Sequence, residues 1–288
     1  MRRSFSLSWL LVCFCTSFVP AAEPDDESAA DLFGVMYWTD RTAGIYRAAR
    51  DGSEVKLIVE RTHIDSIAVD REGGKLYWTA ITNRGLQFVQ LWQGNLDGTL
   101  PTLLADDLNW VGDVVFDPVD KHVYVASMGD SKIIRMNADG TERDDFLVGI
   151  PRPSRMYLDA KDRKLYWASN ELPRIDRIQL DGSGREAVLE NLPGVAHGFG
   201  VDPTEKKFYW IAQRGALFCA KLDGSERQQL LGGLSNPDGL AIDVENRKLY
   251  WAEKGKVSQA NLDGSTPEAL VSGKTDLYSS LEILPPGE

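Results

Sequence analysis

The sequence is poor in cysteine and contains no site for N-linked glycosylation. Of its three cysteines, Cys13 and Cys15 lie in an apolar N-terminal stretch, and only Cys219 stands in the rest of the chain. A single cysteine cannot form an intramolecular disulfide, so packing alone must hold the fold, and Cys219 is expected to be a small buried side chain. No Asn-x-Ser/Thr sequence occurs. Both absences fit a bacterial-type envelope protein better than an animal cell-surface protein.

Basic residues and long apolar runs are also scarce. The chain has 32 lysines and arginines against 43 acids, a formal net charge of −11, and no basic run after residue 3. A face that binds nucleic acid needs clustered Lys and Arg, so no nucleic-acid partner is expected, and anionic membranes are disfavoured for the same reason. No segment has 18 unbroken apolar residues, so no membrane span is expected.

Residues 1–22 have the features of a secretory signal peptide. Arg2 and Arg3 precede a mostly apolar stretch, Ser6–Phe18, which is too short to cross a bilayer, and small residues follow it at Ala21 and Ala22. The mature protein is therefore expected to be secreted, periplasmic or extracellular. Residues 23–32 are acidic and are expected to be flexible, and residues 285–288 are expected to form a tail.

One motif recurs six times between residues 33 and 284. A tyrosine, usually followed by tryptophan, appears every 40–47 residues, at Tyr37, Tyr77, Tyr124, Tyr166, Tyr209 and Tyr250. An Asp-Gly pair follows each tyrosine, beginning at Asp51, Asp97, Asp139, Asp181, Asp223 and Asp263. An aspartate stands seven residues before five of the tyrosines, at Asp70, Asp117, Asp159, Asp202 and Asp243. Such a period is typical of repeat architectures.

Each repeat predicts four short strands. A small apolar strand ends at the first aspartate, the Tyr-Trp strand follows a turn, and a third strand ends at Asp-Gly, a strong hairpin signal. Four strands in about 42 residues, repeated six times, predict a six-bladed all-β propeller with four antiparallel strands per blade. The first repeat lacks its first strand, and residues 278–284 resemble the missing one. The C-terminal strand is therefore expected to close the ring beside residues 36–40.

The repeats resemble a known family. Tyr37-Trp38-Thr39-Asp40, the Leu-Tyr-Trp and Leu-Asp-Gly-Ser segments, and Asn236–Asp243 are similar to the YWTD (class B) repeats of low-density lipoprotein receptors, over about residues 33–284. The resemblance implies a propeller that binds partners and performs no chemistry. Only the first repeat spells YWTD in full, and the third has Val125 in place of tryptophan. The cysteine-rich EGF-like modules that flank such propellers in the receptors are not in this sequence.

The repeated residues are expected to be scaffold. The tryptophans and tyrosines should fill the space between blades, because a strand directs alternate side chains to opposite faces. Arg47, Arg135 and Arg177 each stand four residues before an Asp-Gly pair and are expected to link neighbouring blades, with Asp40 as one partner. Cys219 and the aromatic rings need no functional interpretation under this scheme.

Non-repeated residues mark the candidate site. The turns at one end of the propeller have constant lengths, whereas the loops at the other end vary, and residues 81–92 form an insertion with Phe88 and Trp92. Variable loops on a rigid scaffold commonly carry binding residues. Aligning the first strands places acids, one arginine, one histidine and a tryptophan at this variable end. The predicted partner-binding residues are Asp65, Trp110, Asp113, Arg155, His197 and Asp238.

Two functions fit this ring of residues. The first is an exported, monomeric, non-catalytic module that binds a protein, peptide or glycan, with no cofactor and no metal. The second is a metal-dependent hydrolase of the gluconolactonase-like type, in which Asp65, Asp113, Asp238 and Glu282 offer oxygen ligands to a cation in the channel. No Gly-x-Ser-x-Gly nucleophile motif and no His-Glu-x-x-His metal motif occur. The binding module is the preferred interpretation.

Overall fold

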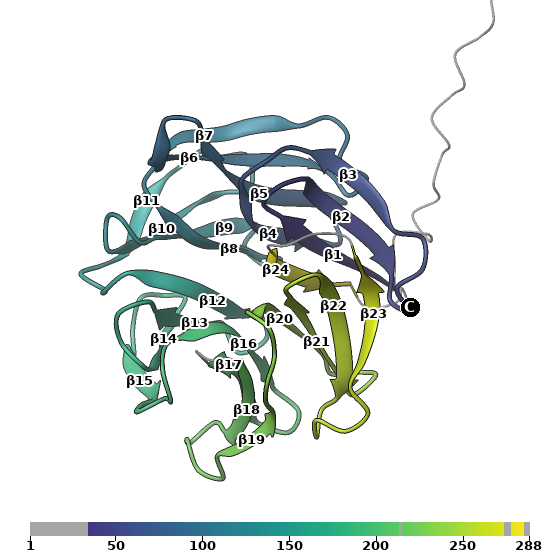
Figure 1. Ribbon diagram of the computed structural model, residues 1–288. Coiled ribbons are helices and arrows are strands. Elements are labelled where there is room, and N and C mark those ends of the chain that lie inside the picture. Colours follow the sequence, from purple (N-terminus) through teal and green to yellow (C-terminus); the bar gives the residue numbers. More distant parts are fainter. Residues whose placement is uncertain (1–33, 213–214, 274–277, 285–288) are drawn as a thin grey trace, which may run out of the picture.

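The computed structural model describes residues 34–212, 215–273 and 278–284. In these ranges 24 strands form six four-stranded antiparallel sheets, which surround a central axis as the blades of a propeller (Figure 1). The predicted fold class is therefore confirmed. The predicted signal peptide, the acidic segment 23–32 and the tail 285–288 lie outside the described residues. No helix in the described ranges is long and apolar enough to cross a membrane.

In each blade the first strand named lies nearest the central channel and the last lies at the outer edge. Blade 1 contains β24 (Tyr278–Ile283), β1 (Val35–Asp40), β2 (Gly44–Ala49) and β3 (Lys56–Glu60). Blade 2 contains β4 (Ile64–Asp70), β5 (Lys75–Thr82), β6 (Gly85–Asn95) and β7 (Thr102–Leu108). Blade 3 contains β8 (Val111–Asp117), β9 (His122–Ser127), β10 (Lys132–Asn137) and β11 (Asp144–Val148).

The remaining blades follow the same order. Blade 4 contains β12 (Pro153–Asp159), β13 (Lys164–Ser169), β14 (Ile175–Gln179) and β15 (Glu186–Leu189). Blade 5 contains β16 (Ala196–Asp202), β17 (Lys207–Ala212), β18 (Ala216–Lys221) and β19 (Gln228–Leu231). Blade 6 contains β20 (Asp238–Asp243), β21 (Lys248–Glu253), β22 (Lys256–Asn261) and β23 (Glu268–Ser272).

The ring is closed by the C-terminal strand, as predicted. Strand β24 pairs antiparallel with β1, with Leu281 opposite Trp38, and Figure 1 shows the two strands side by side at the centre. The Arg50 guanidinium reinforces this closure, because it donates to the carbonyl oxygen of Leu284 at 2.9 Å and to Asp243 of blade 6 at 2.5 Å. Both ends of the described chain thus belong to blade 1.

The core lies between adjacent blades. The five repeat tryptophans are at most 2% exposed. Trp78 packs with blade 1, whereas Tyr77 on the next residue packs with blade 3, as the alternation of a strand requires. Blade 3 replaces the tryptophan by Val125, and its neighbour Phe116 compensates for the lost volume by stacking on Tyr77 with ring centroids 5.2 Å apart. The departure at Val125 is therefore a local repacking.

The repeated aspartates before the Tyr-Trp strands tie blades together. Asp117 accepts a hydrogen bond from the Val119 amide, which fixes the turn, and a two-pronged pair of bonds from Arg163 of blade 4 at 2.7 and 2.8 Å. Asp202 and Arg247 repeat this link between blades 5 and 6 at 3.1 Å. Each of the five aspartates accepts a hydrogen bond from a backbone amide two or three residues further on, as its position in the turn predicts. Asp117, Asp202 and Asp243 also accept from an arginine of the next blade.

The expected blade-linking role of Arg135 and Arg177 is wrong. Arg135 pairs with Asp144 at 2.6 Å and Arg177 with Glu186 at 2.7 Å, each on the outer strand of its own blade. The physical reason is register, since each arginine stands directly opposite its acid across the third and fourth strands. Asp40 instead accepts from the amide and hydroxyl of Thr42, at 2.7 Å each.

Five of the six Asp-Gly turns lie against the preceding blade. Gly98 has φ of +83°, a conformation that favours glycine, and a Cβ at this position would lie 2.1 Å from the carbonyl oxygen of Ile58 in blade 1. The turn therefore needs glycine both for its backbone conformation and for its close approach to the neighbouring blade. All six Asp-Gly glycines have φ between +79° and +86°, and this shared conformation explains why glycine recurs in every repeat, whereas a Cβ at Gly182 would meet nothing within 4 Å.

Candidate functional site

All six inner strands begin at the variable end of the propeller, so their first residues meet around the mouth of the central channel. In four blades a β-bulge interrupts the pairing of the inner strand near its start. The bulged residues occupy the same position of the repeat and are Asp65, Gly112, Ser154 and His197. A bulge re-aims the side chain that it carries and is frequent beside functional sites. The scaffold thus presents different side chains at one repeated backbone feature.

The structure brings the six predicted residues together at two depths. Asp65, Trp110, Arg155 and His197 line a pocket of about 440 Å³ at the channel mouth. Asp113 and Arg155 line a cavity of about 170 Å³ deeper in the channel. Asp238 is joined to this set through an ion pair with Arg155 at 2.5 Å. Their convergence is a fact of the fold, whereas their role in binding stays a prediction.

Arg155 is held by three blades besides its own. Its Nε donates to the carbonyl oxygen of His197 at 2.6 Å, Nη1 to that of Gly112 at 2.8 Å, and Nη2 to the Asp238 carboxylate at 2.5 Å. Its side chain is 16% exposed. The acids Asp238 and Asp113 raise the pKa of this guanidinium further above its usual value, against the opposing effect of burial. Arg155 is a crosslink across the channel as well as a lining residue.

The carboxylates at the mouth are already engaged. Asp113 bridges two blades, since it contacts the hydroxyl of Ser66 and accepts from the Met156 amide at 2.8 Å. Asp65 accepts from Arg41 at 2.6 Å. Burial raises the pKa of both carboxyl groups, although Arg155 opposes this for Asp113 and Arg41 for Asp65. The mouth predicted as a rim of acids is therefore a rim of mutually neutralised charges.

Glu282 is the carboxyl group that lacks such a partner. It lies on β24 and lines the channel cavity, where other inner strands place Tyr157, Gly200 and Ala241. None of the hydrogen bonds or ion pairs described for the residues of the structure involves its side chain. Burial, followed by repulsion from Asp113, raises its pKa to about 8. At neutral pH this side chain is mostly protonated.

We expect stability to fall as the pH rises from about 4.5 toward 8, because the folded state holds a proton on Glu282 that the unfolded chain releases. Glu282→Gln removes this titration, and the variant should be more stable than the wild type by about 3 kcal/mol at pH 7, with the difference vanishing near pH 4. Urea unfolding of both proteins at pH 4, 5.5, 7 and 8 measures it. Parallel pH profiles would contradict the prediction, as would a variant less stable than the wild type at pH 7.

A second repeated feature presents further side chains at the variable end. His63, Trp110, Arg152 and Asn236 each stand seven residues before a strand aspartate, and all have positive φ, between 33° and 63°. This conformation is strained for residues other than glycine and asparagine and is often found at functional sites. The Arg152 guanidinium covers the Trp110 ring at 4.9 Å and pairs with Glu171 at 3.1 Å.

Of these residues, sequence reasoning identified Trp110 and missed His63 and Arg152. It also missed Arg41, which neutralises Asp65. The signal that could have found the first two is the register itself, because the position seven residues before the strand aspartate varies among His, Trp, Arg and Asn. Positive φ also recurs at Lys121, Arg163, Lys206 and Arg247 in the turns of the constant end, so the backbone conformation belongs to the repeat and only the varied side chains distinguish this position.

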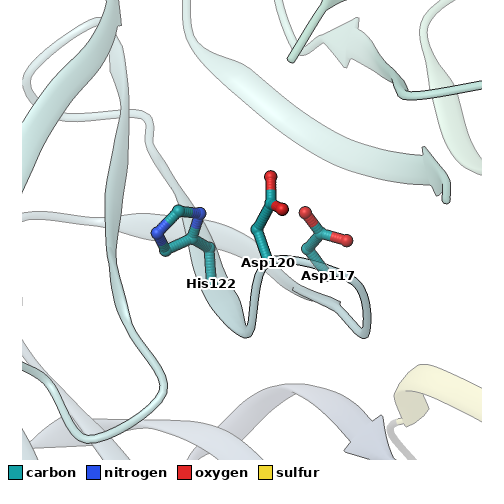
Figure 2. Close-up of side chains that lie close together, drawn as sticks. All are labelled: Asp117, Asp120 and His122. Carbon is teal, nitrogen blue, oxygen red and sulfur yellow. The ribbon is translucent and has the colours of Figure 1, made fainter. Parts of the chain in front are cut away.

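The one group of three metal-ligand side chains among the described residues lies at the opposite, constant end. Asp117, Asp120 and His122 flank the β8–β9 turn, with ligand atoms within 4.8 Å of one another, and Figure 2 shows the imidazole beside the two carboxylates. Arg163 already contacts both carboxylates. A cation would have to replace this guanidinium, so the group is better suited to linking blades 3 and 4.

Comparison with known proteins finds sequence similarity over parts of this chain. No family model matches the chain. The fly protein cueball of Drosophila erecta is 33% identical over 96 residues, which are 30% of this chain and 15% of that protein. Mouse nidogen-2 is 37% identical over 78 residues, 25% of this chain and 6% of its own length. A fungal low-density lipoprotein receptor-related protein 1, from Pyricularia oryzae, is 28% identical over 81 residues, 25% of this chain and 26% of its own.

A solved structure matches nearly the whole propeller. A chain of the structure titled "Crystal structure of Nidogen/Laminin Complex" superimposes with a TM-score of 0.76 at 19% identity, covering 86% of this chain and 97% of that one. The sequence relatives named here come from animals and a fungus, so the expected bacterial character gains no support from them. Each sequence match spans about a quarter or less of its relative's length. The shared repeats and the shared fold make this chain similar to nidogen and lipoprotein-receptor propellers.

Proposed function

We propose that the chain is an exported, non-catalytic module that binds a protein partner with the variable end of its propeller. The observation that carries the proposal is the mouth pocket, where non-repeated side chains from several blades converge on strained or bulged backbone. A mixed set with Trp110 and His197 beside the Arg155 crosslink suits protein recognition, since tryptophan is a frequent interface anchor. The similarity to nidogen, whose solved structure is a complex with laminin, supports a protein as the partner.

Export is supported by the predicted signal peptide and by the resemblance to nidogens and lipoprotein receptor-related proteins. The predicted monomeric state belongs to the same proposal. Fold similarity at 19% identity does not transfer a partner, and the partner here is defined only by its chemistry. The variable end offers the Trp110 indole, charge pairs and backbone carbonyl groups. The partner should therefore present polar groups together with an apolar surface that can pack against the indole.

Trp110→Ala is expected to weaken partner binding about thirty-fold, the effect of losing an interface anchor, with a small change in melting temperature. The measurement is quantitative mass spectrometry of extracellular proteins retained on immobilised wild type and variant, followed by titration with the retained protein. Val119→Ala is the control, because Val119 is 60% exposed on a turn at the constant end. Equal retention by all three proteins would refute a variable-end site.

The metal-dependent hydrolase remains the second candidate, and the carboxylates give it a specific form. Asp65, Asp113 and Asp238 would have to release Arg41, Ser66 and Arg155 to ligate a cation, whereas Glu282 is free to do so. Elemental analysis of the dialysed protein beside an Asp65→Ala, Asp238→Ala double variant separates the two functions. A stoichiometric divalent ion that the double variant loses would favour the hydrolase.

A further inference from the structure

The insertion at the variable end builds a pocket of its own beside the channel mouth. Strands β5 and β6 have 8 and 11 residues, compared with six in the corresponding strands of blade 1. Thr82 pairs with Gly85, so the hairpin tip is the two-residue loop Asn83-Arg84. Between this hairpin and the connection from β3 to β4 lies a pocket of about 730 Å³.

Every titratable side chain that lines this pocket is basic. Arg61 and His63 come from the β3–β4 connection and Arg84 comes from the hairpin tip. The rest of the lining is neutral, with hydroxyl and amide groups such as Thr62 and Gln90. The chain as a whole carries a net charge of −11, so a pocket with cations and no acid is a local reversal of its charge.

The two guanidinium groups are positioned and unpaired. Arg61 lies over the Trp92 ring at 4.7 Å and donates to Gln90 at 2.7 Å, and Arg84 lies over the Phe88 ring at 4.5 Å. Across the described ranges, neither has a carboxylate within ion-pair distance, whereas Arg41, Arg152 and Arg155 on the same end all do. Burial without a compensating acid lowers the pKa of Arg61 from its usual value.

Such an arrangement suits a carboxylate. Arginine presents a planar fork of donors that matches a carboxylate in two-pronged geometry, and stacking on an aromatic ring fixes the fork before binding. An extended polyanion needs a continuous basic track. Here the basic segment is short and directly follows the exposed Glu60 in the chain, whose charge would repel a polyanion.

We propose that the Arg61–Arg84 pocket binds the carboxylate of an aspartate or glutamate side chain presented by a loop of the partner protein. The inference rests on the proposed function and names a second contact for it, beside the channel mouth. Arg61 and Arg84 grip the carboxylate, and Gln90 and Thr62 offer further hydrogen bonds. The pocket thereby gives an acidic propeller attraction for one acidic residue at a defined place.

The test titrates the full chain with a capped peptide, acetyl-Gly-Gly-Glu-Gly-Gly-amide, and with its Gln counterpart, while NMR follows the arginine Nε–Hε signals. We expect the Glu peptide to shift the Arg61 and Arg84 signals saturably and the Gln peptide to leave them in place. Arg61→Gln and Arg84→Gln should each weaken binding about ten-fold or more, because a hydrogen-bonded charge pair is lost. Arg185→Gln should leave the affinity unchanged.

Arg185 is a matched control, because its guanidinium also lies over an aromatic ring, that of Trp167 at 5.6 Å, but outside this pocket. Equal shifts with both peptides, or tighter binding of inorganic sulfate than of the Glu peptide, would overturn the proposal. In a second experiment, the wild type and both variants are compared for retention of the partner. If Trp110→Ala abolishes retention and the Arg61→Gln, Arg84→Gln double variant leaves it unchanged, this inference alone is overturned. Partner retention that neither Trp110→Ala nor the double variant changes would overturn the proposed function.

Discussion

A chain that ends at residue 274 is expected to lose its single cooperative unfolding transition. The deletion removes β24, which is the inner strand of blade 1 and the backbone partner of β1. It also removes Leu281 and Leu284, which are 4% and 6% exposed. Losing one buried leucine side chain costs about 2–5 kcal/mol, and a whole domain is stable by only about 5–15 kcal/mol. Two leucines and a strand ladder therefore exceed the available margin.

The loss should spread beyond blade 1, because β24 joins three blades. Leu281 packs with Trp38 of blade 1 and Tyr250 of blade 6, and the Ser280 hydroxyl accepts from the Ile67 amide of blade 2 at 3.4 Å. Differential scanning calorimetry and circular dichroism measure the transition. Deleting only residues 285–288 is the control and should melt as the full chain does. A chain truncated at residue 274 that melts at the same temperature would show that the ring does not need its closing strand.

The fold could be predicted from sequence because its signals are repeated. One Tyr-Trp or one Asp-Gly pair is weak, but six in register leave a single architecture that satisfies all of them. The closing strand was predictable because the first repeat lacked what residues 278–284 supplied. The blade-linking role given to Arg135 and Arg177 failed because register across a sheet, which sets Arg135 opposite Asp144, is not visible in spacing alone.

The candidate site was predictable only as a set of positions. Aligning the inner strands placed Asp65, Arg155 and Asp238 at one end, since the period of a strand fixes which residues share a level. It did not show which charges neutralise one another. Asp65 turned out to pair with Arg41, and Asp238 with Arg155. These contacts depend on side-chain reach across a curved ring, where partners are 24 and 83 residues apart in the chain.

For the aromatic residues, too, the sequence predicted position but not conformation. Repetition identified Trp78 and its equivalents as scaffold, and they are buried between blades. Trp110 was separable from them because it falls outside the repeat position. What the sequence could not reveal is its left-handed backbone and the Arg152 guanidinium above its ring. The binding proposed for this end therefore depends on backbone and side-chain conformations that the repeat pattern does not reveal.

Arg155→Met is expected to lower the free energy of unfolding by about 3–5 kcal/mol, the cost of removing one partner from a buried ion pair. At roughly 2–4 °C per kcal/mol for a domain of this size, the melting temperature should fall by about 6–20 °C. The methionine fills similar volume but leaves Asp238 and the carbonyl oxygens of Gly112 and His197 without their donor. Thermal unfolding at pH 7 measures the effect.

The cause can be separated from simple loss of contact with a second substitution. Asp238→Leu in the Arg155→Met background removes the orphaned carboxylate, so the double variant should be more stable than the sum of the two single losses predicts. Arg155→Lys keeps the charge but lacks the fork and should fall between wild type and Arg155→Met. If the melting temperature of Arg155→Met lies within about 1 °C of that of the wild type, the crosslink contributes nothing to stability. Arg155 would then be available to contact a partner. A large fall in melting temperature instead identifies Arg155 as the crosslink that maintains the shape of the channel mouth. Trp110 and the Arg61–Arg84 pocket are then the exposed contacts.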